Sequence, residues 1–428
     1  MSYRTAIIGA GFAGLSAAQR LSRSADTEIL LIDRNNYHTF FPLLYQVAAA
    51  ELESEEITSP LRGLLRANRR VSVMRCDVQN IDVEQKVLHT DGPDIHYDYL
   101  ILAMGSVTNF FAVPGAEQLA FTLKSLEDAV LLRSHILNCL EQAALLSESY
   151  PTVYPGLTGD TKTDRQSALT HTVIAGGGAN GVEFAGALME LIRTSIVKDF
   201  PELPKGSVSV TLIEAAGSLL PGFPAVLSEY TRRRLKKMGV SVRTDTSVTE
   251  VRSDAVVLGD GTVLPCATVV WTAGVRAPDL AGKTGLPAGR SGRLQVLPTL
   301  QTAVHPEIFA AGDLSIPDGM NLPMVAPNAI QQGTLAADNL IRLIRNEPLK
   351  PFVYHDKGSM AVVGRGAAVV RIGNRTLSGW FAWLMWLAIH LTYLVGFHNR
   401  IMVMFNWAWD YFCAEKSVRL IFRNDKNR

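Results

Sequence analysis

The chain is poor in cysteine, and this shortage excludes several kinds of chemistry. Its 428 residues include four cysteines, none of them spaced as a CxxC pair or as a set of metal ligands. Scattered cysteines favour a reducing compartment and argue against disulfide or zinc chemistry, so we expect no metal site. All four are expected to be small buried thiols, namely Cys76, Cys139, Cys266 and Cys413.

Net charge is also nearly absent, because the formal value at pH 7 is +1. This balance argues against a nucleic-acid partner. A first apolar strand is expected at residues 5–8, which leaves no room for a signal or transit peptide. The hydrophobic content of 47% supports large cores, and the length allows about three domains.

Two glycine-rich motifs, 167 residues apart, are the most informative positive feature. Each follows a short apolar run and precedes a helix-like stretch, the arrangement that brings a dinucleotide pyrophosphate to a helix N-terminus. Two such motifs suggest two dinucleotides, and a protein that holds two usually moves electrons between them. The motif glycines are Gly9, Gly11 and Gly14, then Gly176, Gly178 and Gly181.

A carboxylate follows the first motif at the expected distance. The apolar strand expected over 28–33 ends at Asp33, which lies 19 residues beyond Gly14. A spacing of about 20 residues suits an acid that accepts a ribose hydroxyl, although a solvated strand end is the alternative. Two later apolar segments, 99–105 and 308–313, close on small residues that let the backbone approach a ligand. Asp313, at the end of the second segment, suits either ligand binding or a helix N-cap.

The second motif has its own acid in Glu214, at the end of a strand expected over 208–213. The spacing exceeds about 20 residues because 193–206 is interpreted as an extra loop. Glu214 would repel a 2′-phosphate by about 4 kcal/mol at 4 Å and an effective dielectric constant of 20, which favours NADH over NADPH. A further strand over 269–274 closes this part at Gly274. Glu183 falls in the first helical turn, where it suits either the helix dipole or a role beside the nicotinamide.

Segments spread along the chain carry a family resemblance. The sequence resembles the two-dinucleotide-binding flavoproteins and, more specifically, the type II NADH dehydrogenases, which are single-subunit NADH:quinone oxidoreductases that do not pump protons. Disulfide reductases need a cysteine pair near the first helix, and sulfide:quinone reductases need cysteines around the flavin. Neither pattern is present. The supporting segments are 36–38, 42–48, 181–186, 219–221, 325–333 and 354–365.

The resemblance implies a role for each matching residue. It implies FAD at the first motif and NADH at the second, with catalytic roles for Glu183, Gln331 and Lys357. Lys357 would place a cation near the flavin pyrimidine edge, with a solvated loop charge as the alternative. The implied FAD contacts are Gly9, Gly11, Gly14, Asp33, Arg34, His38, Pro42, Leu43, Ala103, Gly105, Gly312 and Asp313. The implied NADH contacts are Gly176, Gly178, Gly181, Glu183, Glu214 and Gly274, and the implied quinone contacts are Ala326, Pro327, Gln331 and Gln332.

The C-terminal part contains two apolar runs, 380–397 and 401–412. The first is about 27 Å long as a helix, slightly short of a hydrocarbon core of about 30 Å. Helices lying in one leaflet are favoured, with a single spanning helix or a pair packed in an interface as alternatives. Trp407, Trp409 and Tyr411 suit the water–lipid boundary, and the basic excess after Glu415 suits an anionic surface.

The sequence therefore predicts an α/β fold of two doubly wound, Rossmann-like domains, with the NAD domain inserted in a discontinuous FAD domain. The expected parts are 1–120 (FAD), 121–290 (NADH, with a surface loop over 147–170), 291–350 (FAD) and 351–428 (membrane-associating, with apolar helices over 380–412). We expect a peripheral protein on the cytoplasmic side of a membrane, with a homodimer plausible. The quinone type (menaquinone, ubiquinone or plastoquinone) stays open. So do two other functions, a soluble NADH-dependent flavin reductase acting on a small or protein electron carrier and a non-enzymatic redox sensor.

Overall fold

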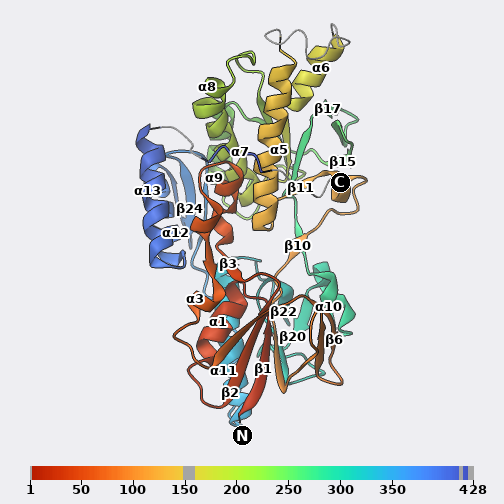
Figure 1. The fold of residues 1–428 in the computed structure, drawn as a ribbon, viewed down its shortest axis with the longest axis vertical. Helices are drawn as coiled ribbons and strands as arrows, with labels where there is room; N and C mark the ends of the chain where they lie inside the picture. Colours follow the sequence, from red (N-terminus) through yellow and green to blue (C-terminus); the bar gives the residue numbers. More distant parts are fainter. Residues whose placement is uncertain (1, 148–159, 414–417, 423–428) are drawn as a thin grey trace. The chain divides into compact units, whose positions relative to one another are not determined.

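The computed structural model describes residues 2–147, 160–413 and 418–422. Its internal contacts divide the chain into two compact units. The first unit contains residues 1–39, 58–107 and 275–357, and the second contains 40–57, 108–274 and 358–428. Figure 1 follows the chain from red at the N-terminus to blue near the C-terminus.

A five-stranded parallel sheet forms the centre of the first unit, in the order β21-β9-β1-β2-β5. Its middle strands are nearly continuous runs of buried aliphatic residues, as expected for a parallel sheet covered on both faces. Gly333 allows α11 to approach α1 closely, because a Cβ there would lie 2.1 Å from the Ala13 carbonyl oxygen. The elements are β1 (Tyr3–Ile8), α1 (Phe12–Leu21), β2 (Thr27–Asp33), β5 (Val71–Arg75), β9 (Tyr99–Leu102), β21 (Ile308–Ala310) and α11 (Ala326–Ile344).

Smaller elements complete the first unit. They are β3 (Tyr37–Thr39), β4 (Thr58–Pro60), α3 (Leu61–Leu64), β6 (Val78–Asp82), β7 (Val87–Thr90), β8 (Ile95–His96), α10 (Asp279–Lys283), η4 (Arg290–Gly292), β20 (Leu294–Val296), η5 (Gly312–Leu314) and β22 (Ser315–Pro317). The short strands β10 (Val107–Thr108) and β19 (Val275–Arg276) stand where the chain passes from one unit to the other.

The second unit repeats the design with the parallel sheet β11-β18-β12-β13-β14. Its strands are β11 (Phe121–Thr122), β12 (His171–Ala175), β13 (Ser209–Ile213), β14 (Ser241–Arg243) and β18 (Thr268–Trp271), and its helices are α4 (Ala116–Leu119), α5 (Leu126–Leu145), α7 (Ala179–Leu191) and α9 (Ala225–Met238). A three-stranded antiparallel sheet joins β15 (Val248–Val251), β16 (Ala255–Leu258) and β17 (Val263–Pro265). Segment 40–57 adds η1 (Phe41–Leu43), α2 (Leu44–Ala48) and η2 (Ser54–Ile57).

Two expected loops are partly helical. The loop predicted over 147–170 is wrong at its end, because Asp160–Leu169 form helix α6, while 148–159 lie outside the described residues. The loop predicted over 193–206 begins instead as a π-helical turn (Ile192–Ile196) and α8 (Val197–Asp199), which continue α7. Pro and Gly residues near each segment suggested a loop, but buried Ile192 and Ile196 hold the second segment helical.

The C-terminal part contains an antiparallel sheet of β23 (Ser359–Val362), β24 (Ala368–Ile372) and β25 (Arg375–Gly379). Two helices follow, α12 (Trp380–Tyr393) and α13 (Phe397–Cys413), which lie side by side at the blue end of the chain in Figure 1. The helix of the first apolar run therefore ends at Tyr393, four residues earlier than the hydropathy of the run suggested, and Gly396 at φ +93° follows. In the part of the chain that the structure describes, no helix has both the length and the apolar composition to cross a bilayer.

The fold class predicted from the sequence is confirmed by two parallel doubly wound sheets and a helical C-terminal region. The first unit is discontinuous, since the chain leaves it and returns. The predicted cofactor domains (1–120, 121–290, 291–350 and 351–428) assign ligands to segments, and they stay predictions.

Candidate functional site

The first glycine motif forms a turn between β1 and α1 whose geometry only glycine permits at two positions. A Cβ on Gly14 would lie 1.8 Å from the Gly9 carbonyl oxygen, and one on Gly9, at φ +98°, would lie 2.4 Å from the Ala103 oxygen. Gly11, by contrast, faces open space, with nothing within 4 Å of an added Cβ. The middle glycine thus leaves room beside the helix N-terminus, as a pyrophosphate requires.

Asp33 and His38 hold the same turn. Asp33 Oδ2 accepts a hydrogen bond from the Ala10 N–H at 2.7 Å, and His38 Nδ1 lies 2.8 Å from the Ala10 carbonyl oxygen. Burial lowers the pKa of His38, so its ring is neutral and Nδ1 donates to that carbonyl. His38 Nε2 is buried and has no partner among the described residues, which marks a polar group that a ligand would satisfy.

The glycine at the end of β21 is fixed by a buried amide. The Gly312 N–H donates to Gln332 Oε1 at 2.6 Å, and the Ser315 hydroxyl donates to the same oxygen at 2.9 Å. Asp313 accepts a bond from the Ser106 hydroxyl at 2.7 Å, so the segments after β9 and β21 meet. Gln332 therefore holds the 312–315 turn, while its own amide nitrogen is buried without a partner among the described residues.

Gln331 fastens the start of α11 to the segment that carries Lys357. Its amide accepts from the His355 N–H at 3.0 Å and donates to the His355 carbonyl at 3.1 Å. Ala326 and Pro327 form the first turn of this helix. Lys357 is exposed. It lies in the first unit, and so do Arg34, Ala103 and Gly105, whereas Pro42 and Leu43 lie in η1 of the second unit.

The second glycine motif has the same construction in the second unit. A Cβ on Gly181 would lie 1.9 Å from the Gly176 carbonyl oxygen, whereas Gly178 has nothing within 4 Å. Glu214 Oε2 accepts from the Gly177 N–H at 2.6 Å, and Oε1 accepts from the Ala216 N–H at 2.8 Å. Gly274, in turn, is in close contact with Phe111, which is 60% exposed.

Glu183 is buried on α7, with 6% of its surface exposed. Gly186 and Gly364 let α7 approach the turn after β23, since a Cβ on Gly186 would lie 3.0 Å from Gly364 N. This approach brings the Val362 N–H within 3.1 Å of Glu183 Oε1. Burial raises the pKa of Glu183 to about 8, although the Val362 N–H and the Trp386 indole N–H both lower it. Glu183 is therefore mostly protonated at pH 7.

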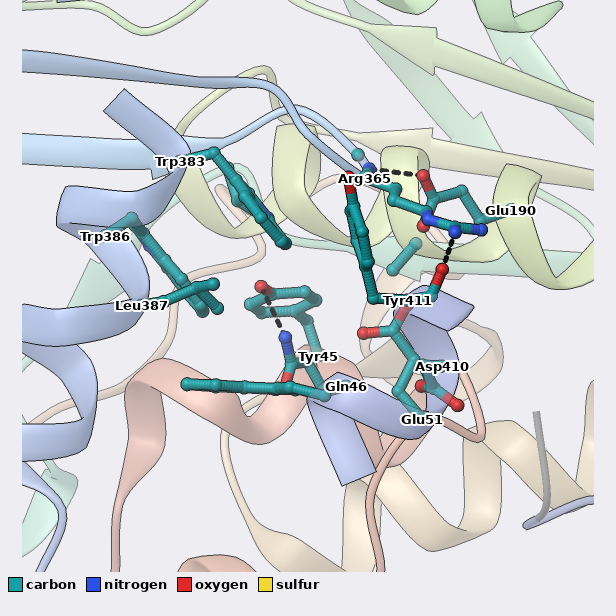
Figure 2. A pocket seen from close by; sticks show the side chains of 14 residues that line it. Tyr45, Gln46, Glu51, Glu190, Arg365, Trp383, Trp386, Leu387, Asp410 and Tyr411 are labelled. Carbon is teal, nitrogen blue, oxygen red and sulfur yellow. Dashed lines mark hydrogen bonds between the residues drawn. The ribbon is translucent and has the colours of Figure 1, made fainter. Parts of the chain in front are cut away.

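A pocket opens beside α7 within the second unit. Figure 2 shows Trp383 and Trp386 of α12, Tyr45 of α2 and Tyr411 of α13 pointing into it. Gln46 joins two of these elements, because its amide nitrogen donates to the Tyr45 hydroxyl at 3.1 Å and its oxygen accepts from Trp407 Nε1 at 2.9 Å. The C-terminal helices therefore form one wall of the pocket.

Sequence reasoning missed this wall. The sequence suggested a lipid boundary for Trp407, Trp409 and Tyr411. Trp407 and Tyr411 line the pocket, and Trp409 is half exposed. α12 is apolar all round, so its pattern could not reveal that Ala382 and Trp386 face inward. The sequence offered one weak signal, Gln46 next to Tyr45, because a glutamine amide can donate to one side chain and accept from another.

Two further expectations need correction. Cys413 is exposed, whereas the other three cysteines are buried as predicted. It lies at the end of α13, whose apolar residues suggested a buried setting. Of the basic tail, Arg419 is described, and its guanidinium lies 2.6 Å from Asp199 rather than free for a surface. Lys416, Arg423, Lys426 and Arg428 lie outside the described residues, as do Glu415 and Asp425.

Comparisons with known proteins agree with this geometry. Residues 3–333 match the family model of the pyridine nucleotide-disulphide oxidoreductases, and residues 356–415 match an NDH2 C-terminal domain. A Mycobacterium tuberculosis protein named type II NADH:quinone oxidoreductase Ndh is 37% identical, over 97% of this chain and 89% of the relative. A probable NADH dehydrogenase of Dictyostelium discoideum is 30% identical, over 94% and 88% of the two chains.

A solved structure shares the fold. NDH2 from Plasmodium falciparum in complex with NADH superposes with a TM-score of 0.87, at 19% identity, over 99% of this chain and 100% of that one. The fold and the two nucleotide turns thus define a pyridine nucleotide-disulphide oxidoreductase of the flavoprotein type. Within that class, the chain belongs to the type II NADH:quinone oxidoreductases, which confirms the resemblance found in the sequence.

Proposed function

We propose that this protein oxidises NADH and reduces a membrane quinone, with FAD as its resident cofactor and without pumping protons. Bound FAD would supply the redox chemistry, accepting a hydride from NADH and giving two electrons to the quinone. One observation carries the proposal: a relative that bears this activity in its name aligns with 97% of the chain. Both nucleotide turns and the C-terminal helices lie within residues 3–333 and 356–415, which match the two family models.

FAD is assigned to the first turn because its residues fit a dinucleotide. Gly11 leaves space at the N-terminus of α1, and the Asp33 carboxylate lies beside it. The buried Nε2 of His38 offers an acceptor to a ribose or ribityl hydroxyl. The remaining proposed FAD contacts are Gly9, Gly14, Arg34, Pro42, Leu43, Ala103, Gly105, Gly312 and Asp313.

NADH is assigned to the second turn by the same reasoning. Gly178 leaves space at the N-terminus of α7, and Glu214 is held by two backbone N–H groups with its carboxylate facing the turn. A carboxylate in that position accepts the ribose hydroxyls of NADH and repels the 2′-phosphate of NADPH. Gly176, Gly181 and Gly274 complete the proposed contacts, and Glu183 stands on the helix that follows.

Glu183 is the proposed proton donor to the quinone. A quinone takes up two protons with its two electrons, so its site needs a group that is protonated at neutral pH. With a pKa of about 8, the Glu183 carboxyl meets that need. Ala326, Pro327, Gln331 and Gln332 are proposed to line the quinone site, where the buried amide nitrogen of Gln332 is an available donor. Lys357 is proposed to place its positive charge near the flavin.

The C-terminal helices are proposed to rest in one leaflet, on the cytoplasmic side where NADH is available. Their outer faces expose large apolar side chains, including Phe381 (70%), Phe405 (64%) and Phe412 (81%). Such faces suit helices that lie in the membrane interface. A quinone would then reach the site from the bilayer without crossing water. The same exposed surface makes a homodimer a further proposal.

Anaerobic mixing tests the function. The purified yellow protein is mixed with NADH, and a ubiquinone or menaquinone analogue is added once the absorbance is stable. We expect NADH to bleach the flavin within the time of one turnover and the quinone to restore the colour. Bleaching that a soluble carrier reverses and quinones do not would favour a soluble reductase. Colour that persists with NADH would contradict both enzymes and favour a redox sensor.

A further inference from the structure

A buried side chain of a C-terminal helix lies at the same pocket as the backbone group that binds Glu183. Trp386 of α12 is 1% exposed, and its indole nitrogen makes no hydrogen bond of ordinary geometry among the described residues. A buried N–H without a partner costs free energy unless some state of the molecule satisfies it. Glu183 lies close by, because Val362, whose N–H donates to Glu183 Oε1 at 3.1 Å, lines the same pocket as Trp386. The indole also lowers the pKa of the Glu183 carboxyl.

We infer that Trp386 is a positioning residue for Glu183, and that its indole N–H is the donor that receives the carboxylate when Glu183 gives its proton to the quinone. The inference rests on the proposed function. In that step the O–H bond of Glu183 breaks and one O–H bond forms on a quinone oxygen, while the hydride given up by NADH supplies the two electrons and the second hydrogen of the quinol by way of bound FAD. The carboxylate then regains a proton from solvent. Between these events, a negative charge stands in a buried site.

Few other groups are able to stabilise that charge. The Val362 N–H already donates to Glu183 Oε1 at 3.1 Å. The Tyr45 hydroxyl stays protonated, because burial raises its pKa well above the usual value, and it accepts a bond from Gln46. The other titratable or charged groups that line the pocket are Glu51, Glu190, Arg365, Asp410 and Tyr411, and His390 stacks on Trp386 from the same helix.

None of these six replaces the indole, and the Tyr411 ring is stacked on Trp383 at 5.4 Å. Glu51, Glu190 and Asp410 are carboxylic acids that would repel a second carboxylate if ionised. The guanidinium of Arg365 lies over the Tyr411 ring, 4.7 Å from its centroid. The backbone N–H of Arg365 donates to Glu190. His390 is neutral, since burial lowers its pKa to about 4, and its Nδ1 lies 2.8 Å from the Trp386 carbonyl oxygen.

The orientation of Trp386 depends on the C-terminal helices. Its ring stacks on His390 at 4.0 Å and packs against Trp407 of α13 at 5.6 Å. Trp407 is in turn bonded to Gln46 of α2. The donor that would stabilise ionised Glu183 is therefore held by the two helices whose outer faces are proposed to meet the membrane. Docking of those helices and proton transfer at Glu183 would then be linked through one side chain.

Removing the N–H while keeping an aromatic ring tests the inference. Full-length, FAD-loaded W386F is compared with W383F, a matched change on the same helix and pocket wall. The protonated Glu183 carboxyl is titrated by its infrared C=O band, identified as the band that E183Q lacks. We expect W386F to raise the titration midpoint by about one pH unit, since a hydrogen bond to a charged group is lost. W383F should leave the midpoint unchanged. An unchanged or lowered midpoint in W386F overturns the inference.

Quinone reduction measured against pH gives the second readout. Activity that needs protonated Glu183 falls as pH rises through its pKa, so in W386F the alkaline fall moves to higher pH. A merely structural role would lower the rate at every pH without moving the midpoint. If W386F does not retain FAD, W386L serves as a second variant without the N–H, judged by the same midpoint.

The failure of the proposed function is distinguishable from the failure of this inference. If E183Q reduces quinone with the wild-type rate and pH profile, Glu183 is not the proton donor and the proposed step is wrong. If E183Q is impaired while the W386F midpoint stays in place, the proposed function survives and the role of Trp386 is wrong.

Discussion

At the scale of single residues, this protein places acids where the backbone fixes them. Asp33 and Glu214 each accept a bond from an N–H in the glycine turn beside them, so the turn and its acid form one unit. Glu183 is different, because it is buried and holds a proton at neutral pH. Its proton is available for chemistry, but the raised pKa lowers the free energy of unfolding above the pKa of the unfolded chain, and this effect can be measured.

Glu183→Gln should make the protein more stable in a pH-dependent way. The folded-state pKa is about 8, against 4.5 for the unperturbed group, so between these values the folded protein holds a proton that the unfolded chain has released. The free energy of unfolding therefore falls as pH rises through this window, by up to about 1.4 kcal/mol per pH unit. The amide does not titrate, so the variant should gain on the wild type as pH rises.

Urea unfolding of both proteins, followed at several pH values between about 5 and 8, checks this expectation. Glu229→Gln is the control, because Glu229 is a surface residue paired with Arg232 and Arg233, and these arginines lower its pKa to about 2. Parallel stability curves for E183Q and the wild type would contradict a raised pKa at Glu183.

At the scale of elements, α12 and α13 serve two surfaces at once. Their inner residues, Ala382, Trp386 and Val403, are buried, while the outer residues Phe381, Phe405 and Phe412 are exposed. Two polar bonds clamp α13 to segment 40–57, one from Trp407 to Gln46 and one from Asn406 to Glu56. The outer face is therefore open to substitution without disturbing the core beneath it.

Phe405→Ser and Phe412→Ser should each weaken binding to lipid vesicles. Burying a phenylalanine side chain contributes about 1.5–3 kcal/mol, so each change is expected to lower the partition coefficient roughly tenfold or more. Flotation with phosphatidylcholine vesicles measures the effect. Val226→Ser removes an apolar side chain that is 64% exposed on α9 and should change nothing. Equal losses in all three variants would mean that α13 is no special membrane surface.

At the scale of the whole molecule, the two units share one architecture, a five-stranded parallel sheet. Each surrounds a parallel sheet with helices and places a glycine turn between a strand and the helix that follows it, β1 and α1 in the first unit and β12 and α7 in the second. The first unit consists of three separate stretches of chain. A ligand bound by this unit would therefore stabilise contacts between distant parts of the sequence.

Removing FAD should lower the melting temperature of the protein. A ligand at about 100 times its Kd stabilises the folded state by about 2.7 kcal/mol, and FAD is proposed to bind the folded protein, with most of its contacts in the first unit. Calorimetry of the FAD-loaded protein, of protein stripped of FAD and of stripped protein with FAD restored makes the comparison. Full recovery on adding FAD back is the control. An unchanged melting profile after stripping would contradict a resident cofactor in this unit.

The sequence by itself determined the two doubly wound sheets, the glycine turns and the acids that follow them, because these features depend on local periodicity and on short spacing between Gly9 and Asp33 or between Gly176 and Glu214. It also carried the family resemblance. Helix α6 and the π-helical turn could not be predicted from the sequence, because segments with a weak hydrophobic pattern take their structure from the elements they pack against. Only the tertiary structure decided that Trp386 and Trp407 face a pocket beside α7, because an apolar helix has no periodicity to show which side is buried. The tertiary structure also decided the raised pKa of Glu183, because burial is a property of the packed molecule.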